Sequence, residues 1–115
     1  SAYCGAVSAG VGAGAGIAYL KGGRFETIAH TVVNAIAVTS GIICDGAKAS
    51  CAAKIAASVD AGLLGLAMFE SGNQFFGGDG IVKKGVENTI ATVGKLVRIG
   101  MEQTDKEIIH LMMEA

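Results

Sequence analysis

Three cysteines are the residues with the clearest chemical potential in this sequence: Cys4, Cys44 and Cys51. An odd number of cysteines argues against a framework of paired disulfides. Their gaps of 40 and 7 residues match no common zinc pattern, because the chain has no Cys-x-x-Cys pair. Two interpretations remain open: three buried thiols that pack as small hydrophobic side chains, or three thiolate ligands of one inorganic centre.

The ligand interpretation depends on where Cys44 lies relative to the helix that follows it. Two cysteines seven residues apart in one helix would be separated by about 10 Å along its axis, too far to share a small cluster comfortably. If Cys44 lies in the preceding loop, the loop can fold back toward Cys51 in the second turn. The helix N-terminus would stabilise thiolates there, and residues 1–5 would supply Cys4 from a separate segment.

Charged residues surround this pair of cysteines. Lys48 and Lys54 share the predicted helix, and their simplest role is to pack their stems on the surface with the ammonium in solvent. The functional alternative places Lys48 near an anionic substrate or the cluster. Asp45 is predicted to be the N-cap of the helix, and its alternative role is in substrate binding or catalysis.

Three further ionisable residues have plainer expectations. His30 lies on a largely apolar segment, which favours a structural histidine over a general base. His110 is close to the C-terminal end of the sequence and is predicted to be solvated. Asp60 lies in an apolar stretch and is expected to be buried and paired.

Four glycines alternate through the first helical segment: Gly10, Gly12, Gly14 and Gly16. Each glycine costs a helix about 1 kcal/mol relative to alanine, so tight packing or a bound group must offset them. Residues 10–15 formally match the dinucleotide-binding fingerprint. That motif needs a preceding strand and an acidic residue about 20 positions later, and only a short polar, Gly-containing segment precedes it here.

The elements that must position these groups are predicted to be helices. The pattern places them at residues 6–20, 25–39, 45–69 and 86–100, followed by a short last helix after a capping box at 104–107. Gly22 and Gly23 predict the end of the first helix. The β-branched content of residues 25–39 leaves a strand possible there. We therefore predict an all-α fold of four to five helices, with a small-residue, Gly-rich first helix and short Gly-rich loops.

Apolar residues at helical spacing predict which faces of these helices are buried. The expected stripes are Ile28, Val32 and Ile36; Ile55, Val59, Leu63 and Leu66; Val86, Ile90, Val93 and Val97; and Ile108, Leu111 and Met112.

Composition limits the classes of protein. The 115 residues suffice for one domain, and a net charge of -1 argues against a nucleic-acid binder. A mean hydropathy of +0.53 with 18 glycines indicates a face that should be covered. We expect part of a larger protein that self-associates when alone. The longest uncharged runs, residues 1–20 and 27–44, are not convincing membrane spans, which favours a cytoplasmic location without a membrane partner.

The motifs resemble those of a known family. Ser1-Ala2-Tyr3-Cys4-Gly5-Ala6, residues 12–23 and the stretch from Ile43 to Ala52 are similar to the C-terminal part of the serine dehydratase-like alpha-chain family. That group contains iron–sulfur L-cysteine desulfidases and is related to the iron–sulfur L-serine dehydratases. Residues 77–82 and 102–109 resemble the tail of the same family. Because members are several times longer, the resemblance implies that residues 1–115 are one domain, the C-terminal part of a lyase.

The resemblance implies a 4Fe–4S cluster held by Cys4, Cys44 and Cys51. Three protein ligands would leave one iron open as a Lewis acid for the leaving group of a small amino acid. The implied reaction is the conversion of L-cysteine to pyruvate, ammonia and sulfide, with L-serine as the alternative substrate. The general base is not assigned. A non-catalytic helical module with structural cysteines is the alternative of a different class.

Overall fold

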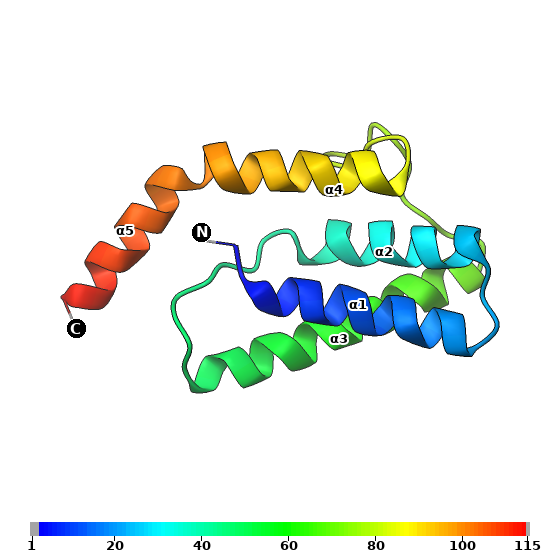
Figure 1. Ribbon diagram of the computed structural model, residues 1–115, viewed down its shortest axis with the longest axis horizontal. Coiled ribbons are helices and arrows are strands. Elements are labelled where there is room, and N and C mark those ends of the chain that lie inside the picture. Colours follow the sequence, from blue (N-terminus) through cyan, green and yellow to red (C-terminus); the bar gives the residue numbers. More distant parts are fainter. Residues whose placement is uncertain (1–2, 115) are drawn as a thin grey trace.

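The computed structural model describes residues 3–114, so Ser1 and Ala2 of the opening motif lie outside it, as does residue 115. The elements are α1 (Gly5–Leu20), α2 (Phe25–Thr39), α3 (Ala49–Glu70), α4 (Val86–Lys95), the π-helical turn η1 (Leu96–Gly100) and α5 (Glu102–Met113) (Figure 1). Within residues 3–114, the prediction of an all-α fold with four to five helices is confirmed. Residues 25–39 form a helix and not a strand.

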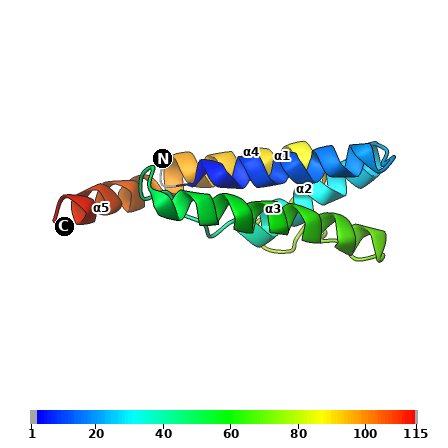
Figure 2. The ribbon, with the colours of Figure 1, turned by 90° about the horizontal axis from the view of Figure 1, so that it is seen from below.

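Three helices make the body of the molecule. Helices α1, α2 and α3 pack against one another, and α4 lies against α2 (Figures 1 and 2). Among the described elements, α5 packs only against η1, and it extends away from the body in both views. The result is an elongated molecule of 48 × 29 × 16 Å.

Glycine allows α1 and α3 to approach backbone to backbone. A Cβ atom on Gly10 would lie 2.1 Å from the backbone carbonyl carbon of Ser58. One on Gly14 would lie 2.8 Å from the Cα atom of Gly62. Non-bonded carbon atoms need about 3.5 Å, so no larger residue fits either position without separating the helices. Dispersion contacts across this seam offset the helix-propensity cost of these two glycines.

The other two alternating glycines behave differently. A Cβ atom built on Gly12 or Gly16 would meet no atom of residues 3–114 within 4 Å, once the adjacent residues and the nearby backbone of α1 itself are set aside. Packing within the described chain therefore offsets the cost of Gly10 and Gly14 but not that of Gly12 and Gly16, which lie on the open face of α1; a bound group at these two positions stays a prediction.

The buried face of α3 is built from small residues: Ser58, Ala61, Gly62, Gly65 and Leu66. The predicted apolar stripe on this helix is wrong, because Ile55 and Leu63 are exposed and Val59 is half-buried; of its members only Leu66 is buried. The close approach of α1 and α2 admits only small side chains. This requirement turns the small face inward and the larger apolar side chains outward.

The other predicted stripes are also only partly buried. Ile36 and Val93 are buried, but Ile90 is exposed. In α5, Leu111 and Met112 are exposed, because that helix has no neighbouring helix to cover them within the described structure.

A buried amide joins the body to the segment that follows it. The side chain of Asn34 donates from Nδ2 to the Gly65 carbonyl at 3.0 Å. Its Oδ1 atom accepts from the backbone N–H of Phe75 at 3.1 Å. One fully buried side chain in α2 therefore fixes both α3 and the loop after it.

The predicted helix ends are partly confirmed. Helix α1 ends at Leu20, just before the predicted stop signal at Gly22 and Gly23. The N–H of Gly22 bonds to Tyr19 O, and that of Gly23 bonds to Ala18 O. The predicted capping box is wrong, because Thr104 lies inside α5 and no side chain caps that helix. Since one residue separates α5 from η1, α5 continues a preceding helical turn and does not begin from a loop.

Helix α3 is also the one described helix that is long and apolar enough to cross a membrane by length and composition. Its 22 residues include a window of mean hydropathy 1.5, of which 28% is buried in the body. Core helices pass the same test. This helix lies outside the two longest uncharged runs of the sequence, residues 1–20 and 27–44.

Candidate functional site

The candidate site lies at one end of the helical body, around the loop that joins α2 to α3. We call residues 40–48 the cysteine loop, because they carry Cys44. Helix α3 begins at Ala49, so Cys44 lies in the loop and Cys51 lies in the first turn of the helix and not the second. This is the arrangement that the three-ligand interpretation requires.

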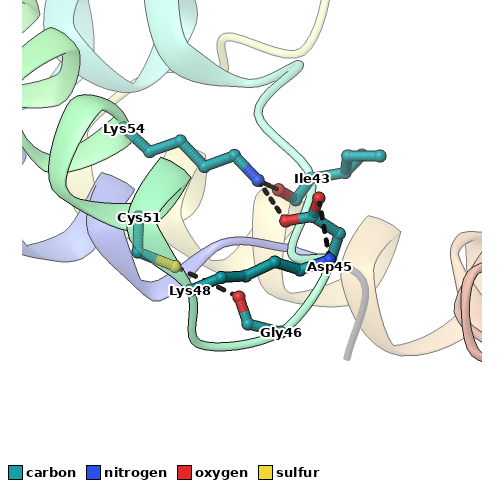
Figure 3. A network of polar contacts seen from close by, with 6 residues as sticks. All are labelled: Ile43, Asp45, Gly46, Lys48, Cys51 and Lys54. Atoms are coloured by element: carbon teal, nitrogen blue, oxygen red, sulfur yellow. Dashed lines mark hydrogen bonds and ion pairs between the residues drawn. The ribbon is translucent and has the colours of Figure 1, made fainter. Parts of the chain in front are cut away.

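Asp45 is not the N-cap of α3, contrary to prediction. Lys48 occupies that position, and it makes no side-chain cap hydrogen bond. The Asp45 carboxylate instead pairs with Lys54 Nζ at 2.6 Å and with Lys48 Nζ at 3.7 Å (Figure 3). The physical reason is the turn at Gly46, whose φ of 95° delays the helix start by three residues and leaves Asp45 outside the first turn.

The N-terminal segment lies directly beside the cysteine loop. The backbone N–H of Cys4 donates to Ile42 O at 3.2 Å, and Tyr3 forms a single antiparallel bridge with Ile43. Cys4 itself is buried. Two cysteine-bearing segments that are 40 residues apart in sequence are therefore held together by backbone hydrogen bonds.

The third cysteine is also tied to the loop. The thiol of Cys51 donates to the Gly46 carbonyl at 3.2 Å (Figure 3). A Cβ atom on Gly46 would lie 3.0 Å from Cε of Met112, so α5 reaches the outer side of this turn. The loop is thus bounded by the N-terminal segment, the start of α3 and one side chain of α5.

Lys54 connects these contacts. Its ammonium donates to Asp45 Oδ1 at 2.6 Å and to Ile43 O at 3.0 Å. The hydrogen bond with Asp45 is the main cause that raises the pKa of Lys54; partial burial opposes it, and the negative charge of Asp45 adds to it. The same hydrogen bond lowers the pKa of Asp45. One ammonium therefore joins the start of α3 to both sides of Cys44 in the cysteine loop.

Lys54 does not extend into solvent, contrary to prediction. Its side chain is 22% exposed, against 48% for Lys48. A signal for this was present, because Lys54 follows Cys51 by three residues and so shares its helix face. The loop that brings Asp45 back to that face could not be predicted from spacing.

The fit of a metal group can be tested on these residues. All three cysteines are free thiols, which is the donor type that iron–sulfur clusters use. Within residues 3–114, however, no group of three or more His, Cys, Asp or Glu side chains is arranged to hold a metal ion. The three thiols and the meeting of their segments fit a cluster. The three sulfur atoms would have to move closer together when they bind it.

The structure also places the three ionisable residues for which the sequence predicts plainer roles. His30 stacks on Phe69 with ring centroids 4.9 Å apart, in keeping with a structural role. His110 is exposed, as predicted, and lies 3.6 Å from Glu114. Asp60 is exposed, so the expectation that it is buried is wrong: it lies on the outer face of α3.

A separate cavity of about 660 Å³ lies at the other end of α2. Its wall includes Phe25, His30, Phe76, Lys83 and Lys84. Since α2 has 15 residues, its two ends are about 20 Å apart, and none of the three cysteines lines this cavity. The cavity and the cysteines are therefore separate features of the described chain.

Fold and site together define an all-helical domain whose helices pack through small residues. The three cysteines lie at one end of it, around the cysteine loop, and we call this part the cysteine end. The sequence places this domain in a family. Residues 1–110 match the model of the serine dehydratase alpha chain, and the chain belongs to that family. The resemblance seen in the motifs is thereby confirmed.

Curated relatives extend this result. The UPF0597 protein of Desulfitobacterium hafniense is 65% identical over 98% of this chain, and that of Lachnoclostridium phytofermentans is 53% identical over 98%. That of Treponema denticola is 49% identical over 99%. The chain spans only about a quarter of these relatives (26%, 27% and 26%). No solved structure matches the chain.

Proposed function

We propose that this chain is the C-terminal, cluster-binding part of an iron–sulfur lyase that converts L-cysteine to pyruvate, ammonia and sulfide. Membership of the serine dehydratase alpha chain family supports a lyase. The observation that carries the cluster is the meeting of the three cysteine-bearing segments at the cysteine loop. Water completes the balance of the reaction, because hydrolysis replaces the amino group by the keto oxygen.

The proposal assigns roles to this chain's own residues. The thiolates of Cys4, Cys44 and Cys51 would hold a 4Fe–4S cluster, which supplies a Lewis-acid iron for the departing thiol when it is bound. Lys48 is the candidate residue to bind the carboxylate of the substrate. Its side chain is half exposed, and its contact with Asp45 is longer than that of Lys54. Asp45 would act there as the partner that orients Lys48.

The reaction also needs a base that removes the α-proton of the substrate. Since two lysines engage Asp45, the carboxylate of the cysteine loop, we place the base in the remainder of the longer enzyme. The 115-residue chain alone is therefore expected to be inactive. The proposal includes a cytoplasmic location, because a reducing compartment keeps the three thiols available for iron.

The exposed apolar side chains suggest where that remainder packs. Leu64 on α3 is 49% exposed and Leu111 on α5 is 55% exposed. We expect the remaining three-quarters of the enzyme to cover these faces, with self-association in its absence. The proposal treats α3 as a packing helix and not as a membrane span, because its small face is buried against α1 and α2.

Turnover assays test the proposed reaction. A protein of family length that contains these residues would be purified without oxygen and given L-cysteine or L-serine. We expect equal amounts of pyruvate and sulfide from L-cysteine, and loss of both products in Cys4→Ser, Cys44→Ser and Cys51→Ser.

Two other outcomes are informative. Pyruvate from L-serine with none from L-cysteine would favour the L-serine dehydratase alternative, which the family description supports. Turnover that is unchanged in all three cysteine variants would leave the cysteines as structural thiols and the segment as a packing module.

A further inference from the structure

The contacts of Lys54 bracket the central cysteine of the site. Its ammonium donates to the carbonyl of Ile43, the residue before Cys44, and to the carboxylate of Asp45, the residue after it (Figure 3). The two distances are 3.0 and 2.6 Å. A single side chain from α3 therefore fixes the backbone on one side of Cys44 and the side chain on the other.

This pairing differs from an ordinary surface salt bridge. Exposed ion pairs contribute little, because water and salt screen them. Lys54 is the less exposed of the two lysines that reach Asp45, and it also satisfies a backbone carbonyl of the loop. A charge-assisted hydrogen bond of this kind is stronger than a neutral one. Two of the three ammonium donors are engaged, so Lys54 is poorly suited to bind a substrate.

The same loop carries the links to the other two cysteines. The N–H of Cys4 bonds to Ile42 O, and the thiol of Cys51 bonds to Gly46 O. The residues that accept these bonds lie immediately outside the pair that Lys54 holds. Loss of the two Lys54 hydrogen bonds would therefore loosen the loop that carries Cys44 and that is hydrogen-bonded to Cys4 and Cys51.

We propose that Lys54 is a positioning residue that holds Cys44 in place for cluster ligation. This inference rests on the proposed function, and it adds a residue that contacts neither iron nor substrate. A loop that is fixed in advance loses less conformational freedom when it binds a metal group. Lys54 would act in this way, with Asp45 and the Ile43 carbonyl as its anchors.

The test is to measure the loop directly in the full chain without iron. Amide hydrogen exchange over residues 42–47 and pulsed alkylation of each thiol, both analysed by mass spectrometry, would be compared among variants. Lys54→Met keeps an apolar stem but removes both hydrogen bonds. We expect exchange in the loop and alkylation of Cys44 to rise roughly tenfold, the factor for losing one charge-assisted hydrogen bond.

Matched variants separate positioning from charge and from misfolding. Lys48→Met removes the longer, more exposed contact to the same carboxylate and is expected to change either rate less than twofold. Lys54→Arg keeps the charge and the donors and should restore most of the protection. Asp45→Asn removes the salt bridge from the loop side, which keeps the test available if Lys54→Met does not fold.

Iron content then distinguishes this inference from the proposed function. After anaerobic reconstitution with iron and sulfide, we expect Lys54→Met to lose iron to a chelator faster than the unsubstituted protein, with rescue by Lys54→Arg. Unchanged loop exchange and Cys44 alkylation in Lys54→Met would overturn the inference, as would unchanged iron retention. If the unsubstituted protein takes up no iron and sulfide, the proposed function fails, while the loop measurements still decide whether Lys54 holds Cys44.

Discussion

The seam between α1 and α3 and the cysteine end of the body are stabilised in opposite ways. At the seam, glycines let two backbones touch, and any added atom is excluded. At the cysteine end, a loop with a left-handed turn is held by a few hydrogen bonds between partly exposed groups. The same three helices therefore combine a close-packed seam with a loop that is held mainly by polar contacts.

The largest expected effect concerns the seam. Gly10→Ala adds a methyl group where a Cβ would lie 2.1 Å from the Ser58 backbone, and we expect a loss of about 3 kcal/mol or more in the free energy of unfolding. The matched control is Gly12→Ala, on the open face of the same helix. It should stabilise the protein by about 1 kcal/mol, because alanine is the better helix former.

Urea unfolding followed by circular dichroism would measure both variants. Equal changes in stability for Gly10→Ala and Gly12→Ala would mean that the close contact between α1 and α3 does not exist. The seam would then not be stabilised by backbone contact, and it would not differ in this way from the cysteine end.

A smaller effect is expected for the buried amide of α2. Asn34→Ala would leave the Gly65 carbonyl and the Phe75 N–H without their side-chain partner, at a cost of about 2 kcal/mol. Asn88→Ala is the matched control, because the amide of Asn88 is exposed where it bonds to Lys84 O. Thermal unfolding would compare the two, and similar midpoints would contradict the role of Asn34 as a link between α3 and the following loop.

The smallest effect is the pH dependence of the cysteine end. The pKa of Asp45 is lowered, so its pairing stabilises the fold above about pH 4 and is lost as the pH falls through the lowered value. The pKa of Lys54 is raised, so its contribution is present below about pH 10 and is lost as the pH rises through the raised value. The pairing should therefore be constant near neutral pH.

The difference in thermal midpoint between the unsubstituted protein and Asp45→Asn would check this. We expect a small difference that is flat between about pH 5 and 9 and that shrinks at acidic pH. A difference that changes near pH 7 would point to another titrating group and contradict the assigned pair.

Sequence patterns predict the seam and the cysteine end to different extents. Helix positions follow from periodicity and from stop signals such as Gly22, whose positive φ ends α1 as expected. The inward face of α3 could not be predicted, because a rule that buries large apolar residues selects Ile55 and not Gly62. When two helices touch through their backbones, residue size decides the packing and hydrophobicity does not.

At the cysteine end, the sequence predicts the candidate site residues. It does not predict which of them pair with one another. The three cysteines, Asp45 and Lys48 were all candidates, and the structure brings their segments together. The partner of Asp45 could not be predicted, because it depends on the turn at Gly46 that moves the helix start to Ala49. Local propensity does not encode that three-residue shift.

The central claim is that Cys4, Cys44 and Cys51 act as one ligand set. The most direct measurement is the iron and sulfide content of the protein after anaerobic reconstitution, together with its visible absorption, for the unsubstituted chain and the three single Cys→Ser variants. The account predicts about four irons and four sulfides per chain, with marked loss of the cluster in every variant. Iron and sulfide binding that is absent from the unsubstituted protein, or equal in all four proteins, would contradict it.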